Sequence, residues 1–503
     1  MRLFLINPRN PTISLVHVAK NRFNKYRIWK PLGLLILARI TPPEWDITVI
    51  DENLSDWDYK SMPHPDLVGL TAFTSQAGRA YELAAEFRRR DVPVVMGGIH
   101  ATMCLDEALQ YVDTVVTGEA EEVWVQVLED ARNGGLKRVY HGGVVDMAKV
   151  PPARHDLLPN GYAFGSIQTT RGCPLNCSFC SVSAFNGRRF RRRPIEQIIE
   201  EFKLIKEKLV LVVDDNLIGT SKAHTEDTKD LFRAMIAARI RKKWIGQVTV
   251  NMGEDEELVR LAGLSGCFGV LIGFESPTEA GLIEINKKFN LREGVVLRES
   301  VRRLQRHGIA VIGSFIFGLD VDRRGIGRQI AEAAAAYGVD MLELMFVTPL
   351  PGTQLWAAME TQGRIVANSF PEDWKYYTLN IPVANYMHLS WTDMIDEFMA
   401  CFRHFYSYPR ILARSLGGFL RTGRCLSTLA SLVGNINFKV NVKHDLEVFR
   451  TLQTDRGRPY AELISSASPA AFGNAAPKTA QSTMQPNAPL PLPILAPTGT
   501  PQV

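Results

Sequence analysis

The residues best suited to chemistry are three closely spaced cysteines, Cys173, Cys177 and Cys180, in the segment TRGCPLNCSFC. Thiolates are the usual protein ligands of the irons in iron–sulfur clusters. Three thiolates on one loop can hold three irons of a [4Fe–4S] cube, which leaves one iron open. An open iron can bind the amine and carboxylate of S-adenosylmethionine (SAM). An electron passed through the cluster would then break a carbon–sulfur bond and leave a 5′-deoxyadenosyl radical.

Two other interpretations of these cysteines are a zinc knuckle and a set of inert buried thiols. Zinc needs a fourth ligand, and no His or Cys follows at a suitable spacing. The other four of the seven cysteines are scattered, and a chain of 503 residues with so few is not a secreted disulfide scaffold. The sequence therefore favours a metal cluster in a reducing compartment, and we predict a cytoplasmic protein.

The composition restricts the class of protein only loosely. Hydrophobic residues make up 46% of the chain, enough for two or three domains with cores of their own. The net charge of +5 gives no argument for nucleic acid as a partner. The apolar run at the N-terminus is too short for a signal peptide, and no apolar run is long enough for a transmembrane segment.

Strand-like and helix-like segments alternate in residues 1–145, which predicts a parallel sheet covered by helices. The expected strands are 3–6, 46–50, 67–71, 92–96 and 114–116, and the expected helices are 32–40 and 79–90. Ligands of such sheets bind beyond the carboxyl ends of the strands. There, Gly97 and Gly98 would let the backbone approach a bulky ligand, or would simply make a tight turn.

A Pro- and Gly-rich linker is expected at 146–165, followed by a second alternating series at 166–385. Its expected strands are 166–169, 210–214, 244–250, 269–273, 310–317 and 341–347, with helices such as 195–208 and 292–307. Six strand–helix units predict a partial or full α/β barrel with functional groups at the carboxyl ends of its strands. Residues 386–464 should be mostly helical, and the Pro/Ala-rich tail 465–503 has the composition of a disordered segment.

The cysteine spacing, between Gly-Cys-Pro and the aromatic Phe179, resembles the signature of the radical SAM superfamily. The segment PLPGT at 349–353 is similar to a PxPGT turn of these enzymes. The resemblance implies that the three cysteines hold the cluster and that Phe179 belongs to the cofactor site.

The resemblance also suggests carboxylates for binding SAM. It implies that Asp214 or Asp215, after the second strand of the series, helps to hold the methionine moiety. It implies that Glu275, after the fourth strand, contacts the nucleoside. Alternatively, Glu275 forms an ion pair with Lys287 or Arg292.

Residues 1–385 together resemble the cobalamin (B12)-binding-domain-containing radical SAM enzymes, with matching stretches such as GGIHAT at 97–102 and GEAE at 118–121. The implied fold is α/β, an N-terminal Rossmann-like (flavodoxin-like) parallel sheet followed by a partial (β/α)6 TIM-like radical SAM barrel and a helical C-terminal region. The implied cofactors are a [4Fe–4S] cluster, SAM and cobalamin. The cobalt-ligating pattern Asp-x-His-x-x-Gly is absent, so we do not expect His100 to bind cobalt. The alternative is a degenerate domain that only shapes the substrate pocket.

The function implied is a cobalamin-dependent C-methyltransferase acting on an unactivated carbon of a lipid, pigment or natural product. Alternatives are a radical oxidoreductase or cyclase of the same class, or a non-catalytic Fe–S/cobalamin sensor. Enzymes that methylthiolate tRNA carry three more cysteines in their first domain, where this chain has only Cys104, so nucleic acid is not expected as a partner. No catalytic side chain is assigned.

Two further segments bear on partners. The basic run at 188–193 either is solvated or steers an anionic substrate or a reducing electron donor such as flavodoxin or ferredoxin. Residues 411–433 have an amphipathic pattern with interspersed arginines, which indicates either packing against the barrel or a surface helix near lipid. The second alternative would make the protein peripheral to a membrane and its substrate hydrophobic.

Overall fold

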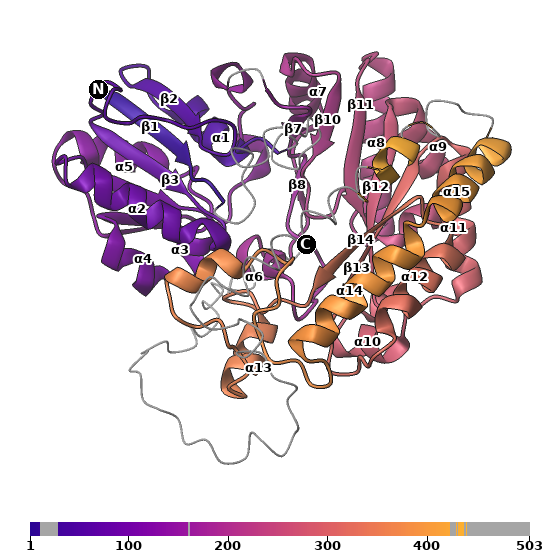
Figure 1. Ribbon diagram of the computed structural model, residues 1–503. Coiled ribbons are helices and arrows are strands. Elements are labelled where there is room, and N and C mark those ends of the chain that lie inside the picture. The colour runs from indigo at the N-terminus through magenta and orange to yellow at the C-terminus, as the bar shows by residue number, and fades with distance from the viewer. Residues whose placement is uncertain (11–28, 159–160, 423–428, 430, 437–438, 440–503) are drawn as a thin grey trace, which may run out of the picture.

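Two parallel sheets, each with six strands, form the framework of the protein (Figure 1). The computed structural model describes residues 1–10, 29–158, 161–422, 429, 431–436 and 439. The predicted tail at 465–503 and much of the region 423–464 lie outside the described residues. In the described ranges, no helix combines the length and the apolar character needed to cross a bilayer.

The first sheet has the strand order β2-β1-β3-β4-β5-β6, with all neighbours parallel. Its strands are β1 (Arg2–Asn7), β2 (Asp46–Asp51), β3 (Leu67–Thr71), β4 (Val94–Gly97), β5 (Thr114–Thr117) and β6 (Val139–His141). The helices are α1 (Leu32–Ile40), α2 (Ala77–Arg88), α3 (Ile99–Met103), α4 (Leu105–Tyr111) and α5 (Trp124–Arg132).

Strand β1 shows why this sheet is covered on both faces. Leu3 and Leu5 belong to one hydrophobic cluster, whereas Phe4 and Ile6 belong to another. Successive side chains of a strand point to opposite faces, so a continuous apolar run fits only a strand buried on both sides.

The second sheet has the order β14-β13-β12-β11-β10-β7 and is also parallel. Its strands are β7 (Gly165–Ile167), β10 (Leu209–Val212), β11 (Lys243–Val248), β12 (Cys267–Glu275), β13 (Ala310–Phe317) and β14 (Met341–Phe346). Helices α7 (Ile195–Leu204), α8 (Lys222–Ala237), α9 (Glu256–Ser265), α10 (Glu279–Glu284), α11 (Gly294–Arg306) and α12 (Ile326–Tyr337) come between or after them. Because β7 and β14 do not pair with each other, the barrel is partial, as predicted.

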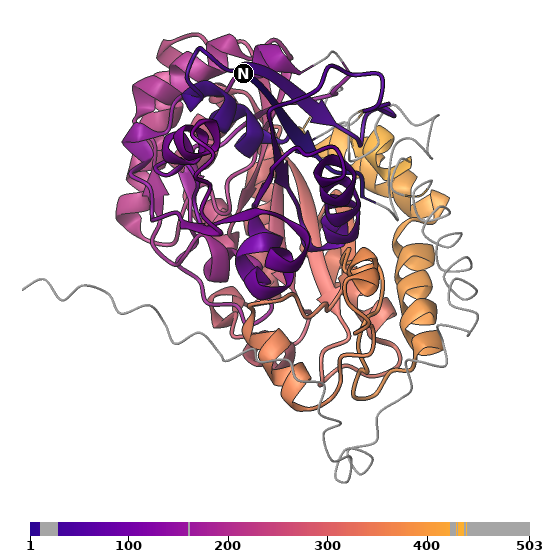
Figure 2. The ribbon, with the colours of Figure 1, turned by 90° about the vertical axis from the view of Figure 1, so that its left-hand side faces the viewer.

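A short antiparallel hairpin, β8 (Thr170–Arg171) with β9 (Arg191–Arg192), frames the cysteine segment, and α6 (Ser181–Phe185) lies within it. Towards the C-terminus follow α13 (Gln354–Thr361), α14 (Trp391–Phe405) and α15 (Tyr408–Thr422). Helix α14 packs against α12, and α15 lies at the periphery of the molecule in both views (Figures 1 and 2). The predicted fold class is confirmed, while the domain boundaries at 145, 165, 385 and 464 stay predictions.

Candidate active site

The three cysteines lie on the loop between β8 and α6, and backbone contacts hold this loop in place. The amide of Cys173 donates to the Gly187 carbonyl at 3.3 Å, and that of Ser178 to the Ile285 carbonyl at 3.0 Å. Gly172 has φ +84°, and a Cβ there would lie 2.3 Å from the Arg189 carbonyl oxygen, so a glycine is required. The loop is thus fixed to the neighbouring turn and to the end of α10.

The thiols share one electrostatic environment. Burial raises the pKa of each of them, that of Cys177 to about 12, while the nearby Lys287 ammonium acts to lower all three. The backbone amides of Leu175 and Val182 donate to Cys173 and Cys180 and also favour their thiolate forms.

This donor set fits an iron–sulfur cluster. In the described ranges, no three His, Cys, Asp or Glu side chains lie close enough together to surround a single metal ion. Three thiolates on one loop can hold three irons of a cube, and backbone N–H groups directed at sulfur stabilise it.

A buried ion pair lies beside the thiols. Glu275, at the end of β12, has φ +67° and adjoins a bulge in the pairing with β13. Its Oε1 lies 2.5 Å from Nζ of Lys287. Burial alone would lower the pKa of Lys287, but the charges of Glu275 and Cys177 outweigh it and raise that pKa. The ion pair considered for Glu275 is therefore formed with Lys287, whereas Arg292 contacts Glu254 at 2.9 Å.

The two aspartates after β10 support the strand and loop that carry the cysteines. Asp214 accepts hydrogen bonds from the amides of Thr169 and Thr170, at 2.5 and 3.0 Å, and is fully buried. Asp215 accepts from the amide of Gly172 at 2.9 Å and from the side chain of Asn186 at 2.9 Å. Burial raises the pKa of both carboxyl groups. Asp215 therefore binds the residue directly before Cys173, whereas Asp214 binds the strand that leads into the cysteine loop.

The carboxyl edge of the first sheet carries the glycine pair. Gly98 has φ +90°, and a Cβ there would lie 2.6 Å from Oγ1 of Thr71. A Cβ on Gly97 would meet nothing closer than the Val116 carbonyl oxygen at 3.5 Å. The backbone conformation at residue 98 therefore requires glycine, whereas a side chain at residue 97 would make only ordinary contacts with the protein.

His100 does not reach this edge. Its side chain is buried and its Nε2 lies 3.0 Å from the hydroxyl of Tyr81. Phe73, by contrast, follows β3 and is 65% exposed. Gly97 and the exposed ring of Phe73 are therefore residues at this edge that could lie against a bulky ligand such as cobalamin, whereas the imidazole of His100 is buried against Tyr81.

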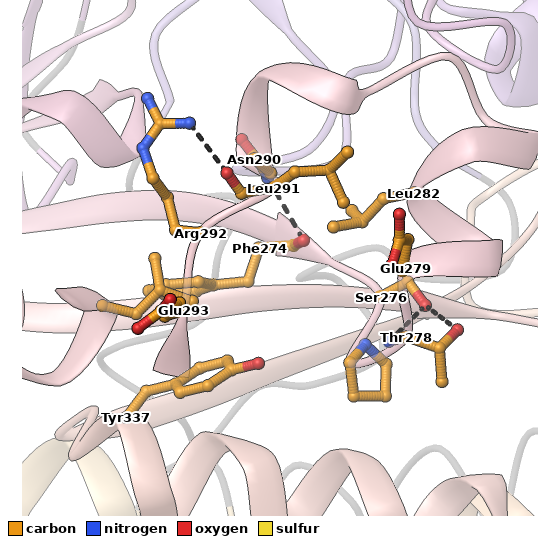
Figure 3. Close-up of a pocket in the computed structure, with 12 residues that line it drawn as sticks. Phe274, Ser276, Thr278, Glu279, Leu282, Asn290, Leu291, Arg292, Glu293 and Tyr337 are labelled. Carbon is orange, nitrogen blue, oxygen red and sulfur yellow. Dashed lines mark hydrogen bonds between the residues drawn. The ribbon is translucent and has the colours of Figure 1, made fainter. Parts of the chain in front are cut away.

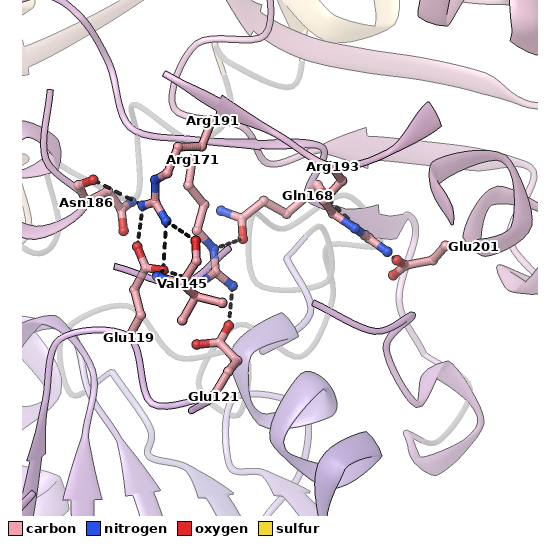
Figure 4. A network of polar contacts seen from close by, with 9 residues as sticks. All are labelled: Glu119, Glu121, Val145, Gln168, Arg171, Asn186, Arg191, Arg193 and Glu201. Atoms are coloured by element: carbon pink, nitrogen blue, oxygen red, sulfur yellow. Dashed lines mark hydrogen bonds and ion pairs between the residues drawn. The ribbon is translucent and has the colours of Figure 1, made fainter. Parts of the chain in front are cut away.

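Two features escaped the sequence reasoning. Lys287 was considered only as a partner of Glu275, although it lies near all three thiols. Arg171 and Arg191 form ion pairs with Glu119, which lies after β5 of the first sheet (Figure 4). The position of Arg171 directly before Gly-Cys was a signal that could have been used.

The cavity in Figure 3, about 360 Å³ in volume, is distinct from the cysteine site. It is lined by Phe274 and Ser276, which flank Glu275, and by Tyr337 of α12, which lies against Phe274. The Glu275 carboxylate instead contacts Lys287 beside the thiols. The cavity therefore lies on the side of β12 that the helices cover.

Comparisons with known proteins agree with this arrangement. Residues 167–325 match the model of the radical SAM superfamily, and residues 24–128 match that of the B12 binding domain. Bacteriochlorophyllide d C-12(1)-methyltransferase of Chlorobaculum tepidum is 27% identical over 426 residues, 82% of this chain and 89% of that protein.

Two solved structures share the fold. The radical SAM methyltransferase TsrM from Kitasatospora setae, with cobalamin and a [4Fe–4S] cluster bound, has a TM-score of 0.56 at 20% identity and covers 72% of this chain and 78% of its own. The cobalamin-dependent SAM radical enzyme OxsB, with aqua-cobalamin and SAM bound, has a TM-score of 0.62 at 12% identity, covering 92% and 74%.

The cysteine loop on a partial parallel barrel makes this chain a member of the radical SAM superfamily. Within that superfamily, it belongs to the enzymes that carry a B12-binding domain. The predicted cofactors, a [4Fe–4S] cluster, SAM and cobalamin, are confirmed, and such an enzyme uses a small-molecule substrate and a reductant.

Proposed function

We propose that this protein is a cobalamin-dependent C-methyltransferase that acts on an unactivated carbon of a pigment, lipid or natural product. The relative named above is a methyltransferase for bacteriochlorophyllide d and aligns with most of this chain. The observation that carries the proposal is the combination in one chain of a B12-binding domain, residues 24–128, with the cysteine loop of a radical SAM domain, residues 167–325.

In this proposal Cys173, Cys177 and Cys180 hold the cluster. When bound, the cluster and SAM would supply the radical chemistry that activates the substrate carbon, and methylcobalamin would supply the methyl group. The chain itself holds the loop rigid and keeps the Lys287–Glu275 pair beside the thiols.

The remaining predicted residues take roles that follow from their positions. Asp215, Glu275 and Phe179 would line the SAM side, whereas Asp214 would act through the strand and loop that it supports. Gly97 and Gly98 would lie on the cobalamin side, with Gly97 leaving space for the ligand.

Product analysis tests the reaction class. Anaerobically reconstituted enzyme with cluster, cobalamin and reductant should convert SAM to both 5′-deoxyadenosine and S-adenosylhomocysteine, with one carbon added to the substrate. An oxidoreductase or cyclase would form 5′-deoxyadenosine without S-adenosylhomocysteine. A sensor would form neither, and either of these two outcomes would refute the methyltransferase.

The electron donor would be a small acidic protein such as flavodoxin or ferredoxin. Arg191, Arg192 and Arg193 are engaged inside the protein, but Arg188 and Arg189 are exposed next to the turn that binds the Cys173 amide. Opposite charges guide encounter and raise association rates. Turnover with flavodoxin should fall about tenfold in R188E/R189E and stay unchanged with a chemical reductant. The exposed pair R239E/R241E is the matched control, and an equal effect there would refute this docking site.

The helix α15 supports peripheral association with a membrane. Leu412, Leu416 and Leu420, spaced by four residues on one face, are 59–74% exposed, while Ile411 is buried against the protein. No Asp or Glu occurs between Glu397 and Asp445. An apolar face in a basic, acid-free region is complementary to a bilayer with anionic headgroups, where a hydrophobic substrate would also lie.

Vesicle flotation tests this association. The enzyme should float with vesicles containing phosphatidylglycerol and not with phosphatidylcholine alone, and the triple variant L412Q/L416Q/L420Q should remain in the dense fraction. If the wild type does not float, or if light scattering shows that the exposed face joins two copies of the chain, the membrane proposal is wrong.

A further inference from the structure

Four charged side chains join the first sheet to the hairpin β8–β9 beside the cysteine loop (Figure 4). Glu119 and Glu121 follow β5 of the first sheet, while Arg171 and Arg191 belong to the hairpin β8–β9. Their side chains are only 6–11% exposed. The contact is therefore a buried junction and not a solvated surface pair.

Glu119 is the centre of the junction. Its Oε2 accepts hydrogen bonds from Arg171 at 3.1 Å, from Arg191 at 3.0 Å and from the Val145 amide at 3.0 Å. Its Oε1 accepts from a second nitrogen of Arg191, and Glu121 takes the other end of Arg171. Burial would raise the pKa of Glu119, but the two guanidinium groups and the amide outweigh it, so the carboxylate stays charged. Removal of this charge would leave buried arginines without their partner.

The junction continues directly into the cysteine loop. Arg171 precedes Gly172, whose amide is held by Asp215. Arg191 also donates to the backbone carbonyl of Asn186, and the Asn186 side chain binds the same Asp215 carboxylate. Both ends of the cysteine loop are therefore connected to Glu119, one through Arg171 and the other through Arg191.

Glu119 itself lies at the ligand-binding edge of the first sheet. It follows Gly118, which has φ +69° and where a Cβ would lie 2.9 Å from the Gly142 carbonyl oxygen, so this turn is also fixed. Gly97 ends the neighbouring strand β4, and Gly98 follows it directly. One carboxylate thus connects the edge proposed for cobalamin with the loop proposed for the cluster.

We propose that Glu119 is a positioning residue that fixes the separation of cobalamin and cluster and so couples radical formation to methyl transfer. The inference rests on the proposed function. Reactions between held groups are sensitive to displacements of about 1 Å. A loosened junction would let the adenosyl radical take a hydrogen atom from the substrate while the methyl group is out of reach. The substrate radical would then regain an electron from the reductant and a proton from solvent, so 5′-deoxyadenosine would accumulate without methylated product.

The test uses the reconstituted holoenzyme and E119Q, with E201Q as the matched control. Glu201 pairs with Arg193, and both are at least as buried, but Glu201 contacts Ala153 and His155 and not the first sheet. Pulsed electron paramagnetic resonance would measure the distance between the reduced cluster and cob(II)alamin. We expect E119Q to broaden or shift this distance and E201Q to match the wild type.

The second readout is the ratio of 5′-deoxyadenosine to methylated product. It should rise about fivefold or more in E119Q at unchanged iron and cobalamin content, and E119D should restore part of the coupling. If E119Q does not fold, R191K, which keeps the charge and loses the fork geometry, replaces it in both measurements. An unchanged distance and ratio would overturn the inference. A wild type that makes no methylated product refutes the proposed function instead, because the distance measurement requires no turnover.

Discussion

The carboxyl edges of the two sheets use their polar residues differently. On the first sheet, Asp51 at the end of β2 accepts hydrogen bonds from Asn7 at the end of β1 at 3.0 Å, from Asn53 at 2.9 Å and from Tyr162, which precedes β7, at 2.6 Å. On the second sheet, Asp214 and Asp215 accept hydrogen bonds from the strand and loop that carry the thiols. Asp51 therefore stabilises the first sheet itself, whereas the second edge holds a loop whose helix α6 has no buried residue.

The two edges should therefore differ in how strongly a substitution there disturbs the bound cofactors. A change on the second edge should disturb a reactive group directly, because each carboxylate there has a loop or cation as its partner. Apart from Glu119, a change on the first edge should mainly alter the stability of the sheet.

The largest effect should follow from Cys177→Ala. Loss of one of three thiolates should abolish the four-iron centre and all 5′-deoxyadenosine formation, which iron analysis and product assays would measure. Cys267→Ala, at the opposite end of β12, is the control and should keep full iron content. Retention of the cluster by the Cys177 variant would show that the loop is not its site.

The next largest effect is expected from Lys287→Met. This change leaves Glu275 buried without its cation, which costs about 3–5 kcal/mol in comparable pairs. Thermal unfolding of the apoprotein should shift to lower temperature and the KM for SAM should rise. The exposed neighbour provides the control, since Lys288→Met should change neither. If the Lys287 variant is as stable as the wild type, the Lys287–Glu275 pair does not stabilise the site.

On the first edge, Gly98→Ala should cost about 1–3 kcal/mol, because alanine must adopt φ +90° and its Cβ would run into Thr71. Gly97→Ala should cost much less, since its Cβ meets only ordinary contacts. The unfolding midpoints of the two variants measure the difference. Equal midpoints would mean that the backbone relaxes around residue 98.

The smallest effect concerns Asp51. Burial raises its pKa above 3.8 in the folded protein, so folding favours the protonated form. Its contribution is therefore fully present below the unfolded-state pKa and is lost as the pH rises through the folded-state pKa. Relative to Asp51→Asn, the wild type should be most stable near about pH 4 and lose that advantage at higher pH, as urea unfolding would show. An advantage that grows with pH would contradict this sign.

Periodic segments were predictable from the sequence. The helix expected at 32–40 and the strands expected at 67–71 and 310–317 have the bounds of α1, β3 and β13. Strand β6 has three residues and α3 has five, too few to show a period, so both were missed. Neither local composition nor spacing marks such short elements, because tertiary packing forms them.

The candidate site also has parts that the sequence predicts and parts that it does not. The cysteines were found because their spacing is local, whereas the partners of Arg191 and Arg171 lie 72 and 52 residues away in the sequence. A basic run was expected to be solvated or to steer a partner, yet Arg191 is held by Glu119, Arg192 by Leu217 and Thr228, and Arg193 by Glu201. Only the fold brings these charges together.

The order of residues along the chain determines when the two sides of the Glu119 junction are translated. Domains fold largely as units, the N-terminal one first as the ribosome delivers it. Glu119 emerges 52 residues before Arg171 and 72 before Arg191. The first sheet, whose last strand β6 ends at His141, can therefore form before the cysteine segment has been translated, so that the arginines of the hairpin meet Glu119 already in place.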